Sequence, residues 1–211
     1  MTTKEKLLAL LEDSKGTFFS GEEIARTLQV SRAAVWKAVN ALREDGYTID
    51  AATNKGYRLS PDSDILSPQG IRRFLKPEYR DLDLTVLPTA PSTNALVREK
   101  ANQGRPEGCV IVACEQTAGR GRYGRQFFSP VDSGVYLSLL LRPTAYSPQQ
   151  ATCLTAAAAA AMCQAIEAVT GQQPGIKWVN DIFLHGKKVC GILTEAAVGL
   201  ETGTLNYMVL G

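Results

Sequence analysis

The stretch Gly119-Arg120-Gly121-Arg122-Tyr123-Gly124-Arg125 places three arginines on a backbone that contains three glycines. Each guanidinium is a permanent cation whose donors fit a carboxylate or a phosphate, and the glycines let the chain approach a ligand closely. The spacing also matches the dinucleotide fingerprint G-x-G-x-x-G, but that fingerprint requires a helix to begin at the glycines. Here residues 126–130 and a strand-like apolar run at 135–141 follow instead. The stretch argues against a Rossmann fold and predicts an anion-binding loop.

Around this loop, the chain alternates between strand and helix patterns. Helices are expected at 92–102 and 148–169. Strands are expected at 82–87, 108–114, 134–142, 176–178, 182–184, 189–194 and 205–210. The alanine run 156–161 predicts a helix face that packs closely against the sheet. Several hairpins and two helices indicate an α+β domain with a mainly antiparallel, mixed sheet.

Residues 1–60 predict three helices followed by a β-hairpin. Leucines form the apolar stripe of the first helix, Ser20 caps the second, and Ser31 caps the third, which runs to Glu44. The tip of the hairpin is expected at 53–56. This order is typical of a winged helix-turn-helix, whose third helix enters the major groove of DNA.

Several polar residues of this segment are expected at the DNA, on the third helix and on the wing. They are Ser31, Arg32, Lys37, Asn40, Lys55 and Arg58. The segment carries nine Lys or Arg against eight Asp or Glu, so one copy would bind DNA modestly. A protein-docking or vestigial module is the alternative. A linker rich in helix and strand breakers follows, which predicts domains at 1–62 and 63–211.

Composition limits the possible function classes. The chain has 211 residues, a net charge of +2 and 45% hydrophobic residues, which suits a globular protein without a nucleic-acid coat. No signal-peptide pattern opens the chain, and no apolar run reaches the ~20 residues expected of a membrane span, so a cytoplasmic protein without a membrane partner is expected. The five cysteines lack C-x-x-C spacing, which favours reduced thiols. The single histidine, His185, argues against histidine-based catalysis and zinc sites.

Four blocks in a fixed order carry a resemblance to a known family. They are Ser92-Thr93-Asn94 with Gln116, the Gly/Arg loop 119–125, Lys177-Trp178-Val179-Asn180-Asp181, and residues 186–195 with Gly191. This set resembles the catalytic domain of biotin–protein ligases. With the N-terminal segment, the chain resembles the bifunctional ligases of this family that also act as biotin operon repressors. The resemblance implies a catalytic domain of the biotin/lipoyl ligase type, and the chain is expected to lack the family's C-terminal β-barrel.

The resemblance implies that biotin and ATP form biotinyl-5′-adenylate and that biotin then passes to an acceptor lysine. Two anions meet in the first step, so fixed cations must offset their repulsion. Lys177 is expected at the carboxylate, and Arg120 and Arg122 at the adenylate phosphate and the ligand carboxyl region. Lys188 adds positive charge. A Gly/Arg loop that is disordered when empty and folds over the ligand would exclude water from the adenylate.

The remaining roles also follow from the resemblance. Asn180 or Asp181 is expected to hold Mg²⁺ that arrives with ATP, and Asp181 joins Lys177, Arg120 and Lys188 in the catalytic set. The ring pocket of biotin is expected to be lined by polar groups, with Trp178 as a wall or as a plain core aromatic. The biotin and adenylate set is Ser92, Thr93, Asn94, Gln116, Gly119, Arg120, Gly121, Arg122, Lys177, Trp178 and Gly191.

The partners expected from the resemblance are biotin, ATP, a biotin carboxyl carrier protein, operator DNA and, once liganded, a second copy of the chain. Three positions depart from the family pattern: Phe127 in place of Trp, Val179 in place of Pro, and Pro91 in place of Asp. None of them removes a charge that the chemistry needs. Two other functions remain open: a biotin-sensing DNA-binding regulator without turnover, and a lipoate–protein ligase.

Overall fold

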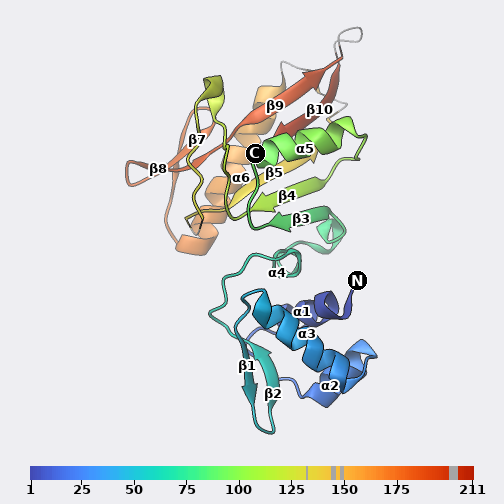
Figure 1. Ribbon diagram of the computed structural model, residues 1–211. Helices are drawn as coiled ribbons and strands as arrows, with labels where there is room; N and C mark the ends of the chain where they lie inside the picture. Colours follow the sequence, from blue (N-terminus) through green and yellow to red (C-terminus); the bar gives the residue numbers. More distant parts are fainter. Residues whose placement is uncertain (132, 144–145, 148–149, 200–203) are drawn as a thin grey trace. The chain divides into compact units, whose positions relative to one another are not determined.

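The computed structural model describes residues 1–131, 133–143, 146–147, 150–199 and 204–211. The chain divides into two compact units, Met1–Asp81 and Leu82–Gly211 (Figure 1). The structural division therefore comes later in the chain than the linker that the sequence suggests, because a short helix after that linker packs on the first helix.

The first unit is the predicted three-helix and hairpin module. Its elements are α1 (Thr3–Asp13), α2 (Gly21–Leu28), α3 (Arg32–Glu44), β1 (Ile49–Ala52) and β2 (Gly56–Leu59). The predicted caps are present: the Ser20 Oγ accepts from the Glu23 amide at 3.1 Å, and the Ser31 Oγ accepts from the Ala34 amide at 3.2 Å. These bonds satisfy orphan amides at the two helix starts. The hairpin strands begin and end close to the predicted positions.

The core of the first unit is built from the apolar faces of the three helices and the hairpin. It contains Leu7, Leu8, Leu11, Ile24, Val35, Ala38, Val39, Leu42, Tyr47, Ile49 and Leu59. The segment before α2 joins the hairpin, because Phe19 and Tyr57 exchange backbone hydrogen bonds of 2.9 and 2.8 Å. A Cβ at Gly56 would lie 2.6 Å from the Ser20 Cα, and φ there is +92°, so only glycine fits this contact.

A short helix, α4 (Pro68–Arg72), was not predicted and covers a buried carboxylate. Glu12 on α1 is buried, and burial raises the pKa of its carboxyl group, although Lys15 and Arg73 partly oppose that rise. Its neighbour Ser67 caps α4, accepting from the Gly70 amide at 2.9 Å. Burial also raises the pKa of Tyr47 beside the same serine. A 3₁₀ turn, Pro77–Tyr79, follows.

The second unit is built on a five-stranded sheet with the order β3-β4-β5-β10-β9. Its strands are β3 (Asp83–Leu87), β4 (Cys109–Ala113), β5 (Tyr136–Leu141), β9 (Thr194–Val198) and β10 (Leu205–Leu210). Only the β3–β4 pair is parallel, so the predicted mainly antiparallel sheet is confirmed. Helix α5 (Thr93–Asn102) connects these two strands and lies across one face of the sheet (Figure 1).

A separate sheet follows, with β6 (Gly175–Lys177), β7 (Asp181–Leu184) and β8 (Lys187–Gly191). The single strand expected at 189–194 was wrong. Its first residues end β8, whereas Thr194 begins β9 in the larger sheet. The chain changes sheets at Ile192 and Leu193, which pair with Asn180 and Gly211 instead.

Helix α6 (Ala151–Thr170) ends at Gly171 in the left-handed conformation, as predicted. It packs on β6 and β7, but of its described side chains only Thr155 and Ala159 are buried. The close packing expected for the alanine run 156–161 is therefore limited to Ala159, the buried residue of that run. Residues 152–170 have the length and mean hydropathy (1.4) that a membrane span could have, contrary to the expectation from sequence. Length and composition alone define this match, and one such helix carries no argument for a membrane.

Candidate active site

Ser92, Thr93 and Asn94 begin α5, and all three side chains are buried. The chain folds this way because Ser92 is the N-cap, with its Oγ 3.4 Å from the Ala95 amide. Buried polar side chains must be hydrogen-bonded, and each of these has a partner in the structure. The cap turns the next two side chains toward the sheet.

Thr93 and Gln116 form the first part of a polar cluster. The Gln116 Oε1 accepts from the Thr93 amide at 2.8 Å and from the Thr93 hydroxyl at 3.1 Å. The Gln116 Nε2 donates to the Ser129 hydroxyl at 3.1 Å, and that hydroxyl donates to the Phe127 carbonyl at 3.1 Å. The structure thus brings together the two separated parts of the first block, residues 92–94 and Gln116. It adds Ser129, which the sequence did not single out.

Asn94 holds the other part of the cluster. Its Nδ2 donates to Glu195 Oε2 at 2.8 Å and to the Leu193 carbonyl at 3.2 Å. Its Oδ1 accepts from the Ser138 hydroxyl at 2.6 Å, and the same hydroxyl lies 2.8 Å from the Thr93 Oγ1. Since Ser138 has one proton, it cannot donate to both at once. A chain of hydrogen bonds therefore runs from Glu195 to the base of the Gly/Arg loop.

The Gly/Arg loop forms a narrow hairpin. Phe127 donates to the Gly119 carbonyl at 2.9 Å, Gly121 donates to the Arg125 carbonyl at 2.8 Å, and residues 122–124 make a 3₁₀ turn at the tip. A Cβ on Gly119 would lie 2.5 Å from the Phe127 carbonyl oxygen and 2.8 Å from the Ser129 Oγ. Glycine is therefore required at this position by the close approach of the polar cluster. Ligand-dependent ordering of the loop stays a prediction.

Arg122 reaches from the tip of this hairpin to the second block of the site. Its guanidinium donates to the Asn180 Oδ1 at 3.1 Å and lies over the Tyr123 ring at 5.2 Å. A cavity of about 160 Å³ opens beside this pair. It is lined by Arg122, Thr152, Thr155, Val179, Asn180, Ile192, Leu193 and Thr194. Because Leu193 also accepts from Asn94, the cavity adjoins the polar cluster.

Lys177 and Trp178 lie on the solvent side of β6 and the turn after it. Lys177 is exposed, with its Nζ 5.6 Å from the centroid of the Phe183 ring. Trp178 is 76% exposed, so the alternative that it is a plain core aromatic is wrong. Arg120 is also exposed and forms an isolated bridge with Gln126 at the side of the loop hairpin. The structure thus leaves these three side chains open to a ligand.

Asp181 and Lys188 form an ion pair of 2.8 Å across β7 and β8. The Asn180 amide donates to the same Asp181 oxygen at 3.0 Å, and Lys188 also lies 5.8 Å from the Phe127 ring centroid. One carboxylate that is already paired with a cation fits a resident Mg²⁺ poorly. The described residues include no cluster of three metal-ligating His, Cys, Asp or Glu side chains either.

Gly191, the last residue of β8, lies against two side chains of the site. A Cβ there would meet Phe127 at 3.2 Å and the flexible end of Lys188 at 2.8 Å. The neighbouring Cys190 is partly buried, and burial raises the pKa of its thiol, as it does for Cys109. These thiols are poor nucleophiles, which agrees with the expected structural role of the cysteines.

Three residues of the site, Ser129, Ser138 and Arg98, were not found from the sequence, and Glu195, which ends the fourth block, was assigned no role. Glu195 accepts from Arg98 at 2.9 Å as well as from Asn94. Ser138 is the polar interruption of an otherwise apolar strand, which is the one signal that could have pointed to it. Arg98 and Glu195 resemble ordinary surface residues in the sequence, because the partners that they meet lie about 100 residues away in the chain.

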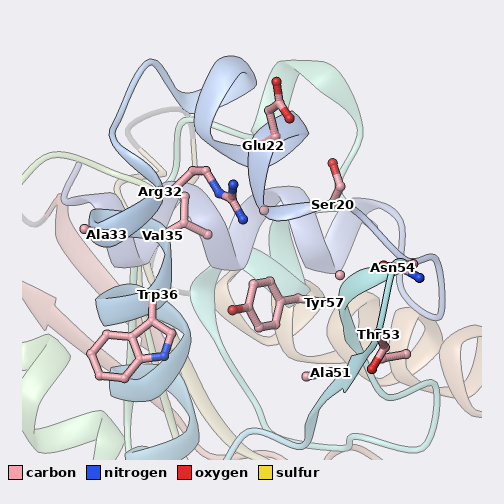
Figure 2. A pocket seen from close by; sticks show the side chains of 13 residues that line it. Ser20, Glu22, Arg32, Ala33, Val35, Trp36, Ala51, Thr53, Asn54 and Tyr57 are labelled. Atoms are coloured by element: carbon pink, nitrogen blue, oxygen red, sulfur yellow. The ribbon is translucent and has the colours of Figure 1, made fainter.

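The candidate DNA-binding face lies on the first unit. Ser31, Arg32 and Lys37 are exposed on α3, and Asn40 is half-buried. On the wing, Arg58 is paired with Asp50 at 2.8 Å and lies 4.7 Å from the Phe18 ring centroid. A groove of about 730 Å³ separates α3 from the wing, with Arg32 reaching over it (Figure 2). Contact of these residues with DNA stays a prediction.

Comparison with known proteins finds a matching family for each of the two units. A model described as the biotin/lipoate A/B protein ligase family matches residues 86–211, and one described as an HTH domain matches residues 3–58. The bifunctional ligase/repressor BirA of Bacillus subtilis is 44% identical over 194 residues, which cover 92% of this chain and 59% of that protein. The protein of the same description from Escherichia coli is 33% identical over 210 residues, which cover 100% of this chain and 62% of its own.

A solved structure shares the fold of the second unit. The biotin protein ligase from Leishmania major, in complex with biotin, aligns with a TM-score of 0.51 and 25% identity over 61% of this chain and 54% of that chain. The chain spans about three fifths of the length of the curated relatives named above. Both expected modules, the winged helix-turn-helix and the ligase-type sheet domain, are confirmed.

Proposed function

The chain belongs to the biotin/lipoate A/B protein ligase family, and from that premise we propose that it is an ATP-dependent biotin–protein ligase that also binds operator DNA as a biotin-responsive repressor. One observation carries the proposal. The cluster of buried Thr93 and half-buried Gln116, which offers donors and acceptors for a polar ring, adjoins the cavity that Arg122 lines. A neutral polar ring and an anionic tail are the two parts of biotin.

In the first step, a biotin carboxylate oxygen bonds to the α-phosphorus of ATP while the bond to the β-phosphate oxygen breaks and pyrophosphate leaves. Exposed cations are needed where negative charge gathers. Lys177 and Arg120 supply this charge, and Arg122 holds the phosphate beside Asn180. Lys188 remains paired with Asp181, so the carboxylate offsets much of the attraction that its ammonium would have for an anionic ligand.

In the second step, a neutral lysine amine of the carrier protein attacks the acyl carbon and AMP leaves. An ordinary lysine has a pKa near 10.4, so a base must take its proton. Mg²⁺ arrives as part of the ATP complex and neutralises phosphate charge. Asn180 presents an amide oxygen next to that phosphate site, whereas Asp181 would first have to leave Lys188.

The partners and location follow from the same proposal. The acceptor is a biotin carboxyl carrier protein, the liganded chain forms a homodimer on operator DNA, and the protein works in the cytoplasm. Dimerisation matters because one helix-turn-helix with a nearly balanced charge makes few phosphate contacts, whereas two linked half-sites multiply affinity.

The test is biotin-dependent exchange of labelled pyrophosphate into ATP, together with the mass of the ligand that the protein retains after incubation with biotin and Mg-ATP. We expect exchange and a retained biotinyl-adenylate. Retained biotin without exchange would indicate a sensor that does not turn over. Exchange driven by lipoate in place of biotin would indicate a lipoate–protein ligase.

A further inference from the structure

Trp36 is the large aromatic side chain at the middle of α3, and it is 58% exposed. The neighbouring Val35, Ala38 and Val39 already fill the core with the opposite face of the helix. Trp36 therefore adds nothing to the core, and an exposed indole at this position leaves a large apolar surface in water. Such a side chain is typical of a recognition surface.

Trp36 lies on the edge of the groove of about 730 Å³ between α3, the start of α2 and the wing. Figure 2 shows Arg32 one turn earlier on the same helix, with its guanidinium extended over the groove, and Tyr57 on the facing hairpin. Arg32 and Trp36 are four residues apart, so they share one helix face. The small Ala33 also lines the groove.

The charges around Trp36 favour duplex DNA as the occupant of this face. Arg32 lines the groove, and Lys37, the residue after Trp36, is exposed. Lys55 lies at the wing tip, 5.9 Å from the Phe18 ring centroid. Glu22 is the acidic residue in the lining, and a carboxylate can accept from the amino group of cytosine. An exposed indole on the same helix face as Arg32, in a unit that also exposes Lys37 and Lys55, suits a polyanion with an apolar feature between its phosphates.

We propose that Trp36 determines operator specificity by packing its indole on the 5-methyl groups of thymines in the major groove. The thymine methyl is the one apolar group that base edges present there. Arg32 and Lys37 hold the flanking phosphates or guanines, so the cations position the helix and the indole selects the sequence. This inference rests on the proposed DNA binding, and it names a residue that electrostatics alone would not suggest.

The experiment first selects duplexes from a random-sequence library with the whole chain in the presence of biotin and Mg-ATP. The selected duplex is then remade with deoxyuridine in place of each thymine, which removes only the methyl group. We expect one such replacement under Trp36 to weaken binding by the parent chain about fourfold, which is the ~0.8 kcal/mol of one buried methyl. Trp36→Ala should bind the two duplexes equally, and Trp36→Phe should keep part of the difference.

Tyr79→Ala is the matched control, because Tyr79 is 52% exposed in the same unit and does not line the groove. It should behave as the parent chain does. Thermal unfolding of Trp36→Ala should match the parent, since the indole is outside the core. If the parent selects no sequence, the proposed DNA binding fails and this inference with it. If Trp36→Ala selects the same sequences and still discriminates thymine from deoxyuridine, or loses affinity equally for all sequences, only this inference is overturned.

Discussion

Asn94 and Glu195 are joined by a hydrogen bond of 2.8 Å between residues that stand 101 positions apart in the chain. An ionised carboxylate only accepts, so Glu195 requires the amide nitrogen of Asn94 to face it. The amide oxygen is then turned to the Ser138 hydroxyl at 2.6 Å. The Glu195 carboxylate and the Leu193 carbonyl, which also only accepts from the Asn94 Nδ2, thus set the direction of hydrogen bonding inside the buried cluster.

Glu195→Gln should weaken biotin binding about tenfold, because a glutamine can present its own amino group to Asn94 and leaves the Leu193 carbonyl as the one acceptor that fixes the amide orientation. The dissociation constant for biotin, measured by calorimetry, checks this. Arg98→Met is the control. It removes the partly exposed ion pair with Glu195 but leaves the bond to Asn94, and exposed pairs contribute little. Equal losses in both variants would show that the ion pair, and not the amide orientation, matters.

Lys177→Ala should lower biotin-dependent pyrophosphate exchange by about 10²–10³, the usual effect of losing a preorganised charge contact. The fold should be unchanged because the side chain is exposed. Lys187 is an exposed lysine on β8 of the same sheet, and Lys187→Ala should exchange at the parent rate. Exchange by Lys177→Ala within a few-fold of the parent would remove this residue from the mechanism.

Arg122→Gly should speed the release of biotinyl-adenylate more than that of biotin, since the proposed function assigns the adenylate phosphate to this arginine, which is hydrogen-bonded to Asn180. Asn180→Ala should give a smaller effect of the same kind. Dissociation rates of the two single variants and the double variant test the link. If the pair acts as a unit, the double variant should be little worse than Arg122→Gly, whereas fully additive effects would contradict it.

Glu12→Gln should make the first unit more stable than the parent at neutral pH, and this difference should disappear in acid. Burial raises the pKa of the Glu12 carboxyl in the folded state, so the folded chain holds a proton that the unfolded chain releases. This group therefore stabilises the fold below its unfolded pKa, and that stability is lost as pH rises through the higher folded pKa. The free energy of unfolding of parent and variant, compared across this window, should converge toward the acid side. A constant difference at every pH would contradict the buried-carboxylate account.

Arg32→Ala should reduce binding to selected duplex DNA without changing pyrophosphate exchange, because Arg32 belongs to the helix-turn-helix unit. Binding by the parent should also require biotin and Mg-ATP if the liganded chain dimerises on DNA. Fluorescence anisotropy at several salt concentrations measures both effects, and loss of one phosphate contact should lower the salt slope by about one. Equal DNA affinity with and without biotin would refute the coupling while leaving the two activities separate.

Local signals account for the parts of the fold that were predicted well. Helix α3 occupies Arg32–Glu44 because Ser31 caps it and its apolar residues repeat at helical spacing. Strand β10 occupies Leu205–Leu210, as its nearly continuous run of apolar residues predicted. The polar blocks around Thr93 and Gln116 were also recognised, and the structure brings them into contact.

What the sequence by itself determined is thus the order of helices and strands, the two modules and the residue types of the site, because caps, turns and periodicity act over a few residues. The tertiary structure alone decided the partners. It placed Thr194 in a different sheet from Gly191, joined Asp181 to Lys188, and brought Glu195 to Asn94. It also left most of α6 exposed. These contacts depend on strand register and on side chains that come together only when distant segments of the chain pack. Local sequence preferences do not determine them.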